Sequence, residues 1–469
     1  MASPPADVDL GKLSYEIFSL LETKFLFGAA PGSVPGTPAR APADDSGRGR
    51  VRVLAIDGCG PGPADALLAA VALARLEAAL RARAGDPAAR VADFFDAAAG
   101  AGAGGVLAAM LLLRGADGRA RYSAADALAF VAASLGSKGG WGGGGGGRRS
   151  RWAALFRRGD RDRSAPLRRV FGDATLRDTV APLLVPCYDL ATAAPFLFSR
   201  ADAVESDSFD FRLRDVCAAT CAGGRGGGAA AEVRSVDGRT AIAAASGGVA
   251  AMGNPTAAAI THVLHNKQEF PLAAGVDDLL VVSIGSGSSA AACATPSAGW
   301  RTPLPPRSPS PAEMVRLTAE GVADMVDQAV AMAFRHTCGR NYVRIQAASP
   351  AACSGGKKPV DAKKAVAQAD GMLAQRNVEA ELFRGRRLSE KSNGEKLDAF
   401  AAELVKEHER RARCPPGLLP TVVIKQHAAA AAATPHRLSS ATTASSATAT
   451  ARSASTAPSP AASQGSYQH

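Results

Sequence analysis

The sequence of 469 residues lacks the features that place a chain in or across a membrane. No run of about 18 apolar residues free of charge and proline stands in a membrane-spanning context, so we expect no transmembrane helix. The opening residues, MASPPADVDL, lack a basic stretch followed by an apolar one, which argues against a secretory signal. We therefore expect a cytoplasmic protein, with peripheral contact to membranes left open.

CxxC pairs, which are typical of zinc and redox sites, are also absent from the sequence. Two cysteines stand four residues apart, a spacing that on a helix is more typical of packing than of half a zinc site. We expect a reduced, intracellular protein, and the sequence suggests no metal and no organic cofactor. The eight cysteines are Cys59, Cys187, Cys217, Cys221, Cys293, Cys338, Cys353 and Cys414.

The segment from Val51 to Met110 contains one pattern twice: a short apolar run, a glycine turn, and a long apolar helix pattern. Strand, turn and helix in alternation are typical of a parallel α/β sheet, in which ligands bind at the carboxyl ends of the strands. The sequence thus predicts an α/β fold, with the glycine turns Asp57–Gly62 and Gly100–Gly105 at that edge of the sheet.

Further elements follow from periodicity and from breaker residues. The expected strands are Val51–Ile56, Phe94–Ala99, Leu183–Asp189, Pro195–Ser199, Asp278–Ile284 and Tyr342–Gln346. The expected helices are Ala64–Arg83, Gly104–Arg114, Phe211–Ala222, a helix opened by Asn254-Pro255, Ala312–Phe334, Asp361–Arg376 and Lys391–Arg411.

Composition divides the chain into consecutive parts. Leu10–Phe27 has apolar residues at helical spacing, which predicts an amphipathic helix that docks on the main domain or lies on a membrane. The predicted parts are this helix and a linker (1–50), an α/β core (51–290) with a Gly/Arg-rich insertion (137–165), a linker (291–311), a C-terminal helical part of the same fold (312–426) and a disordered tail (427–469).

The net charge of +11 is concentrated in Arg148–Arg169, which has nine arginines and two aspartates. Such a segment is typical of a solvated insertion, but it can also attract anionic lipid or nucleic acid. Trp152, Leu155 and Phe156 lie among the charges and favour a membrane surface over nucleic acid.

The first glycine turn, Gly58 to Pro63, does not fit a dinucleotide fingerprint, because Pro63 stands where the third glycine belongs. It fits an oxyanion loop better, with backbone N–H donors at Gly58, Cys59 and Gly60.

The second turn, Gly100 to Gly104, stands where the nucleophile elbow G-x-S-x-G of an acyl hydrolase would stand. The nucleophile position holds Gly102, which has no side chain. The alternative interpretation is a tight turn whose helix N-terminus can hold an anion.

Five motifs in the right order resemble the patatin-like phospholipases, and most closely their plant group III branch, which has a glycine in the elbow. Residues 57–63 resemble the family's D-G-G-G-x-R-G, and residues 94–105 resemble its Y-F-D followed by G-T-S-T-G-G. Residues 187–190 resemble C-Y-D-L, and residues 246–256 resemble D-G-G-V-A-x-N-N-P-T. Residues 278–287 resemble D-L-L-V-L-S-L-G-T-G. The resemblance implies a three-layer α/β/α fold with a mainly parallel central sheet. It also implies a lipid substrate.

The sequence departs from the family at the groups that carry the chemistry. In the family a serine–aspartate dyad cleaves acyl esters; the matching positions here are Gly102 and Ser246, and the arginine of the first loop is Gly62. Branch members are nonetheless described as lipid acyl hydrolases.

Two functions follow from these residues. The first is an atypical hydrolase of phospholipids or galactolipids, with an acyl pocket beside Gly102, oxyanion donors in Gly58–Gly60 and water as nucleophile. The second is an inactive lipid-binding or regulatory protein that Arg148–Arg169 docks on membranes. We expect no nucleic-acid partner. His262 and His265, three residues apart on a helix, are expected in packing or at the surface rather than as metal ligands.

Overall fold

The centre of the fold is β1 (Val51–Ile56), six buried residues that the computed structural model places within a mainly parallel sheet. The strand order is β5-β6-β3-β2-β1-β7-β9, with β4 also paired to β3. Neighbours are parallel from β3 to β9, whereas β4, β5 and β6 join in antiparallel pairs. The structure describes residues 49–58, 63–136, 165–222, 231–245, 251–289, 308, 310–349, 362–381, 385–413 and 422–423.

The bounds of the elements are as follows. The other strands of the sheet are β2 (Ala97–Gly100), β3 (Leu183–Asp189), β4 (Ala194–Ser199), β5 (Ala231–Arg234), β6 (Ala241–Ala245), β7 (Leu279–Ile284) and β9 (Tyr342–Ile345). Outside it lie a two-residue pair, β8 (Ser288–Ser289) with β10 (Ala348–Ser349), and a hairpin, β11 (Arg376–Glu381) with β12 (Gly385–Ser392). The helices are α2 (Pro63–Ala84), α3 (Gly102–Leu112), α4 (Ala124–Gly136), α6 (Ala165–Phe171), α7 (Arg200–Glu205), α8 (Leu213–Thr220), α9 (Thr256–His265), α10 (Pro311–Phe334), α11 (Ala362–Ala374) and α12 (Asn393–Ala412).

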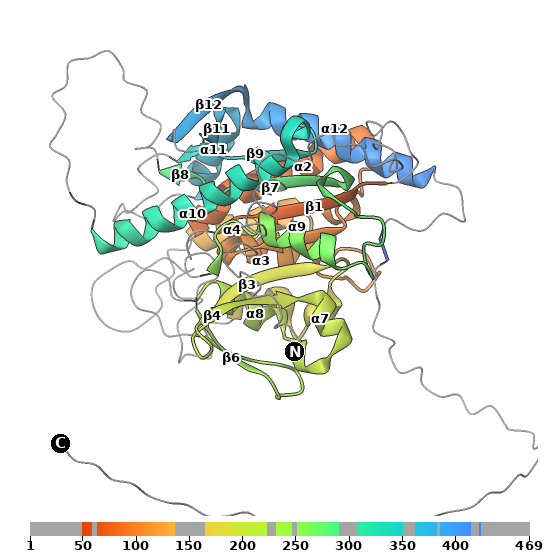
Figure 1. Ribbon diagram of the computed structural model, residues 1–469, viewed down its shortest axis with the longest axis vertical. Helices are drawn as coiled ribbons and strands as arrows, with labels where there is room; N and C mark the ends of the chain where they lie inside the picture. The colour runs from red at the N-terminus through yellow and green to blue at the C-terminus, as the bar shows by residue number, and fades with distance from the viewer. Residues whose placement is uncertain are drawn as a thin grey trace, which may run out of the picture. The chain divides into compact units, whose positions relative to one another are not determined.

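Helices cover both faces of the sheet, because successive strand residues point to opposite sides. Leu54 and Ile56 of β1 pack with α2, α3, α4, α8, α11 and α12 in one core, whereas Val51 and Val53 pack with α9 and α10 in a second core. Figure 1 shows α9 and α10 on one side of the strands and α3 and α4 on the other. The three-layer α/β/α fold with a mainly parallel sheet is therefore confirmed.

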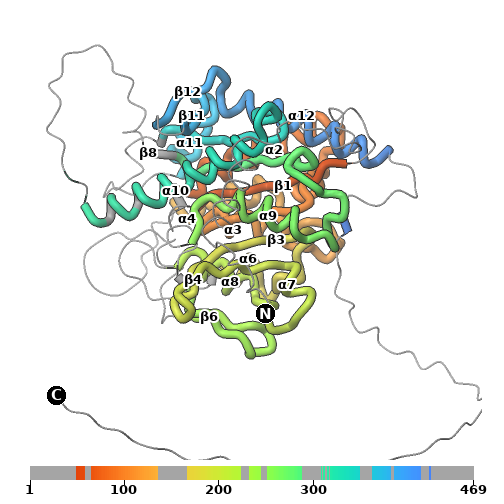
Figure 2. Tube along the Cα trace, viewed as in Figure 1, coloured from red at the N-terminus to blue at the C-terminus, as the bar shows by residue number. Residues whose placement is uncertain are grey.

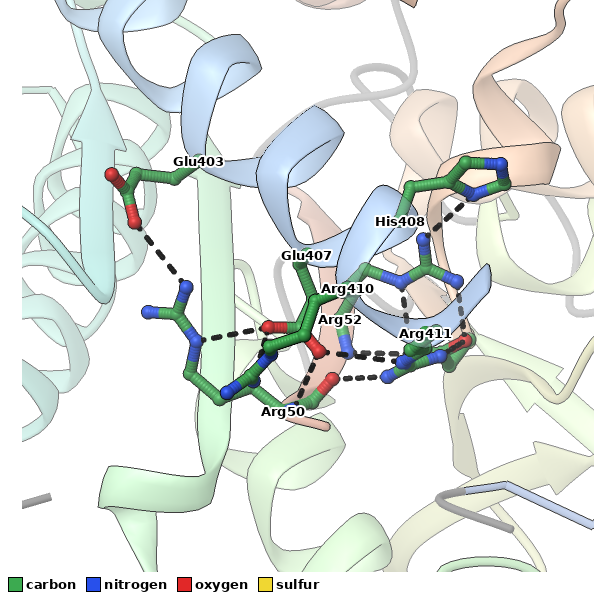
Figure 3. Close-up of polar contacts among 8 residues, drawn as sticks. Arg50, Arg52, Glu403, Glu407, His408, Arg410 and Arg411 are labelled. Carbon is green, nitrogen blue, oxygen red and sulfur yellow. Dashed lines mark hydrogen bonds and ion pairs between the residues drawn. The ribbon is translucent and has the colours of Figure 1, made fainter. Parts of the chain in front are cut away.

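A network of charged side chains joins α12 to the start of β1 (Figure 3). The Asp96 carboxylate, which is buried, accepts hydrogen bonds from the Arg52 backbone N–H (2.7 Å), from the Arg52 guanidinium (2.9 and 3.2 Å) and from two nitrogens of Arg411 (both 2.8 Å). Glu407 accepts from the N–H of Arg50 at 2.8 Å. Burial alone would raise the pKa of Asp96, but Arg52 and Arg411 outweigh it and hold that pKa below its ordinary value. Figure 2 shows the same arrangement along the Cα trace, with α12, the last helix, beside β1, the first strand.

The C-terminal part is less helical than predicted. Asp361–Arg376 and Lys391–Arg411 were expected as two helices, and both helices exist as α11 and α12, but the hairpin β11–β12 lies between them. Lys391 belongs to β12, and α12 begins at Asn393 because the Ser392 hydroxyl caps it by accepting the N–H of Glu395. The hairpin β5–β6 was also missed.

The strand predicted at Phe94–Ala99 is shorter and later than expected. Val91–Phe94 forms a 3₁₀ turn, and β2 covers only Ala97–Gly100. The 3₁₀ turn, in which the Asp93 carboxylate accepts the Arg90 N–H at 2.8 Å, occupies the residue at which the strand was expected to begin. The amphipathic helix at 10–27, the insertion at 137–165 and the tail at 427–469 lie outside the described residues apart from position 165, so these divisions stay predictions.

Candidate functional site

The first and second glycine turns touch each other at the carboxyl edge of β1 and β2. Ala101 donates its N–H to the carbonyl of Ile56 at 3.1 Å. A Cβ at Gly58 would lie 1.8 Å from the Ala101 oxygen, and a Cβ at Gly104 would lie 2.5 Å from the Asp57 and Ile56 oxygens. Glycine is therefore required on both sides of this contact, since any side chain would push the two turns apart.

The elbow keeps the backbone of a nucleophile turn, although it lacks a nucleophile. Gly102 is buried, follows β2 by two residues, begins α3, and has a φ of +50°. Its N–H donates to the Thr220 hydroxyl oxygen at 2.8 Å, where α8 ends. A sharp strand-to-helix turn of this kind presents the serine in acyl hydrolases; here it presents only the backbone.

Asp57, at the end of β1, is committed to Arg344 of β9. Both Arg344 nitrogens reach the carboxylate, one of them at 2.9 Å, and both side chains are buried. Burial raises the pKa of Asp57 above its ordinary value, and the Arg344 guanidinium opposes the rise. Because the carboxylate is held in a bidentate pair, Asp57 fits the structural role that its place in the sequence suggested, rather than that of a general base.

Hydrogen bonds continue from Arg344 to Asn254 and Thr256, at the end of the motif 246–256. Arg344 Nη1 donates to the Ser283 hydroxyl at 2.6 Å, and that oxygen lies 2.8 Å from the Thr256 hydroxyl. Asn254 Oδ1 accepts both the Thr256 hydroxyl at 2.5 Å and the Thr256 N–H at 3.1 Å. Asn254 thus bonds the first residue of α9, which begins at Thr256, but the N-cap position is Pro255, one residue later than the opening expected at Asn254.

The segment before Asn254 also contacts the first turn directly. Gly58 donates its N–H to the Gly253 carbonyl at 3.1 Å. The turn at Gly58, the elbow at Gly102 and the loop at Gly253 therefore surround one edge of the sheet, tied together behind by Asp57 and Arg344. This N–H is already engaged, so Gly58 could serve as an oxyanion donor only by giving up that bond.

Three of the predicted site residues lie outside the described residues: Cys59, Gly60 and Ser246. The chain leaves β6 at Ala245, which pairs with Tyr188 near the carboxyl end of β3. The roles predicted for these residues, and for Gly58, stay predictions.

Neither histidine of α9 belongs to this edge. His262 is largely buried against Phe270, with ring centroids 6.2 Å apart, and burial lowers its pKa. His265 is exposed at the end of the helix. Among the described residues, no three His, Cys, Asp or Glu side chains are grouped so as to hold a metal ion, and no helix there is both long and apolar enough to cross a bilayer.

A cavity of about 380 Å³ lies away from the glycine turns, at the loop that follows α3. Arg90, Arg119 and Arg121 line it. Because α3 starts at the elbow and runs to Leu112, this loop lies at the far end of that helix from the candidate site, so we do not assign the cavity to it.

Two residues that organise the site were missed in the sequence. Thr220 was counted only as part of the predicted helix Phe211–Ala222, and no local pattern marks its hydroxyl. Arg344 did leave a signal, since an arginine in the middle of the expected buried strand Tyr342–Gln346 requires a buried partner of opposite charge.

Comparison with known proteins agrees with this geometry. The family model described as patatin-like phospholipase matches residues 54–223. Patatin-like protein 3 of Oryza sativa is 56% identical over 404 residues, which cover 85% of this chain and 92% of the relative. Patatin-like protein 7 of Arabidopsis thaliana is 44% identical over 441 residues (91% and 86%), and the Arabidopsis protein named "Probable inactive patatin-like protein 9" is 39% identical over 410 residues (85% and 94%). With relatives this similar over most of both chains, and with the paired glycine turns of a lipid acyl hydrolase fold, the chain belongs to the patatin-like phospholipase family.

Proposed function

We propose that the chain is an atypical lipid acyl hydrolase of the plant group III branch, which releases fatty acids from phospholipids or galactolipids. The family consists in general of lipid acyl hydrolases. The observation that carries the proposal is the elbow: Gly102 keeps a φ of +50° at the start of α3 and stays packed on the first glycine turn.

In the proposed reaction the ester carbonyl lies over Gly102 and a water molecule attacks it. The tetrahedral oxyanion is stabilised by N–H groups of Cys59 and Gly60 and by the N-terminus of α3, where Ala103 follows the nucleophile position. The C–O bond to the glycerol oxygen then breaks, the alcohol leaves with the proton that water lost, and the fatty acid remains. Ser246 relays that proton. Oxyanion donors and binding alone give roughly 10³–10⁴-fold acceleration over water.

A second candidate is a lipid-binding or regulatory protein without catalysis. It is favoured by the missing hydroxyl at Gly102 and by the commitment of Asp57 to Arg344, which leaves that carboxylate unable to act as base. In this case the family pocket holds a lipid without cleaving it, and Arg148–Arg169, of which only 165–169 are among the described residues, docks the protein on anionic membranes.

One assay separates the two candidates. The purified full chain is incubated with phosphatidylcholine or galactolipid vesicles, and free fatty acid is measured against a heat-killed blank. The native chain should release fatty acid above the blank, and Ser246→Ala should reduce the rate. The double change Gly102→Ser with Ser246→Asp restores the family dyad. The new serine takes a strained φ that costs about 1–3 kcal/mol.

The outcome that supports the second candidate is equally clear. A native chain that equals the blank, while the restored dyad hydrolyses the same vesicles, shows a working pocket without native catalysis. Gly275→Ser is the matched control for the glycine change, because no heavy atom lies within 4 Å of a Cβ there. It should leave the native rate unchanged.

A further inference from the structure

On helix α10 (Pro311–Phe334), none of the exposed side chains that the structure describes is charged. Met325 is 68% exposed, Met332 60% and Met314 53%, and Val322 lies between them at 45%. The other exposed positions from 317 to 333 are Leu317, Thr318, Gly321, Ala329 and Ala333. Six of the eleven large apolar residues exposed in the described part of the chain lie on this one helix: Met314, Val315, Leu317, Val322, Met325 and Met332.

The three acidic side chains described on α10 pair with other parts of the protein instead. Asp324 accepts from Arg386 of β12 at 2.7 and 2.9 Å, and Glu320 pairs with the same arginine at 3.6 Å. Asp327 is buried and accepts the Tyr342 hydroxyl at 2.6 Å. A surface helix normally has charged residues outside and apolar ones inside. The reversed order along the outer face indicates that another apolar surface covers it.

The chain itself contains a segment of the right kind and length. Leu10–Phe27 has Leu13, Ile17, Leu20, Leu21 and Phe25 at helical spacing. As a helix it would be about 27 Å long, as is the face from Met314 to Met332, at 1.5 Å per residue. Two helices with apolar stripes of equal length can bury both stripes against each other.

The place where this segment joins the fold also fits. Arg50 Nη1 donates to Asn341 Oδ1 at 2.8 Å, and the Asn341 N–H donates to the Thr337 carbonyl at 2.8 Å. Thr337 lies five residues beyond Met332. Arg50, to which the segment Leu10–Phe27 is joined through residues 28–49, is therefore held near one end of the exposed face. The intervening residues 28–49 can span up to about 70 Å when extended, which exceeds the length of α10. The tether gives an effective concentration in the millimolar range.

We propose that Leu10–Phe27 lies along the outer face of α10 (Met314–Met332) as an intramolecular amphipathic helix. This docking does not depend on the proposed function. It covers the apolar face of α10 with a part of the same chain, so a lipid surface or a second copy is not needed to cover it.

Methionine oxidation in the full chain tests the docking. The chain is treated with dilute hydrogen peroxide, and sulfoxide at Met325 and Met332 is followed by mass spectrometry. Ile17→Glu places a charge on the apolar stripe of the segment, and Ser19→Glu places the same charge on its opposite side. Oxidation in the native chain and in Ser19→Glu should be about tenfold slower than in Ile17→Glu, the ratio for a face that is open in about a tenth of the molecules.

Methionine oxidation is also measured in variants of the folded part of the chain, on α10 and on β12. Val322→Glu should accelerate oxidation of Met332, whereas Leu388→Glu, at an exposed apolar position on β12, should not. Equal rates in the native chain and Ile17→Glu overturn the proposal. Protection that appears only with phosphatidylcholine vesicles, or only at high protein concentration, also overturns it, because a lipid surface or a second copy then covers the face. Unchanged thermal melts of all variants ensure that the comparison is between folded chains.

Discussion

Removal of the Arg344 guanidinium should destabilise the fold strongly, and more so at neutral pH than at acid pH. In Arg344→Met the Asp57 carboxylate stays buried without a counter-charge, because the side chains are 1% and 6% exposed for aspartate and arginine, respectively. Breaking a buried ion pair by removing one partner costs about 3–5 kcal/mol. That is a large part of the about 5–15 kcal/mol by which a typical protein is stable.

The pH dependence follows from the direction of the pKa shift. Burial already raises the pKa of Asp57 above its ordinary value, with Arg344 opposing the rise. Without the arginine the pKa rises further, so the folded state binds more protons than the unfolded state above the ordinary carboxyl range. The stability of the variant should therefore fall as the pH rises, and the difference from the native chain should be larger near pH 7 than near pH 5.

Urea denaturation followed by circular dichroism at the two pH values measures both effects. Asp57→Asn in the same chain should recover part of the loss, since a neutral amide needs no counter-charge. Arg387→Met is the matched control: its guanidinium is 62% exposed and pairs with Glu379 at 2.9 Å, so its loss should cost less than about 1 kcal/mol. A loss in Arg344→Met equal to that of the control, or independent of pH, would refute the reasoning.

Three further predictions concern the framework of the site. Asp96→Asn removes the negative charge that pairs with Arg52 and Arg411 and should cost about 3–5 kcal/mol. Because the native pKa of Asp96 is lowered, the stability contributed by this carboxylate is lost on acidification, which acid titration by circular dichroism should show in the native chain but less in the variant. Gly104→Ala brings a Cβ within 2.5 Å of two backbone oxygens and should lower the melting temperature sharply, whereas Gly275→Ala should not. Thr220→Val leaves the Gly102 N–H without its acceptor and should cost about 1–3 kcal/mol in urea denaturation, with Thr220→Ser close to native.

The parallel half of the sheet could be predicted because each of its strands is a short apolar run closed by a turn. Val51–Ile56 was predicted with its observed bounds, and the helix expected at Ala64–Arg83 corresponds to α2 at Pro63–Ala84. Five motifs in order then placed the chain in its family. Burial on both faces makes such strands continuous and apolar, which is the pattern that sequence reading detects best.

The hairpin β11–β12 could not be predicted for the opposite reason. Half of its strand residues are charged, and they pair with other elements, such as Arg386 with Asp324 of α10 and Glu379 with Lys396 of α12. Charged side chains at mixed spacing do not distinguish a strand from the outer face of a helix. Arg344 was missed similarly, because its partner Asp57 lies 287 residues earlier in the chain.

The network of charged side chains that joins α12 to the start of β1, here called the clamp, has a consequence for how the protein is made. Arg50 and its acceptor Glu407 are 357 residues apart, so a nascent chain exposes the first strand of its sheet long before the clamp exists. At about 5–20 residues per second, translation needs roughly 20–70 s to supply it. The partner strand of β1 on that side, β7 (Leu279–Ile284), also follows late, so one edge of the apolar strand Val51–Ile56 stays without its partner through more than half of that time.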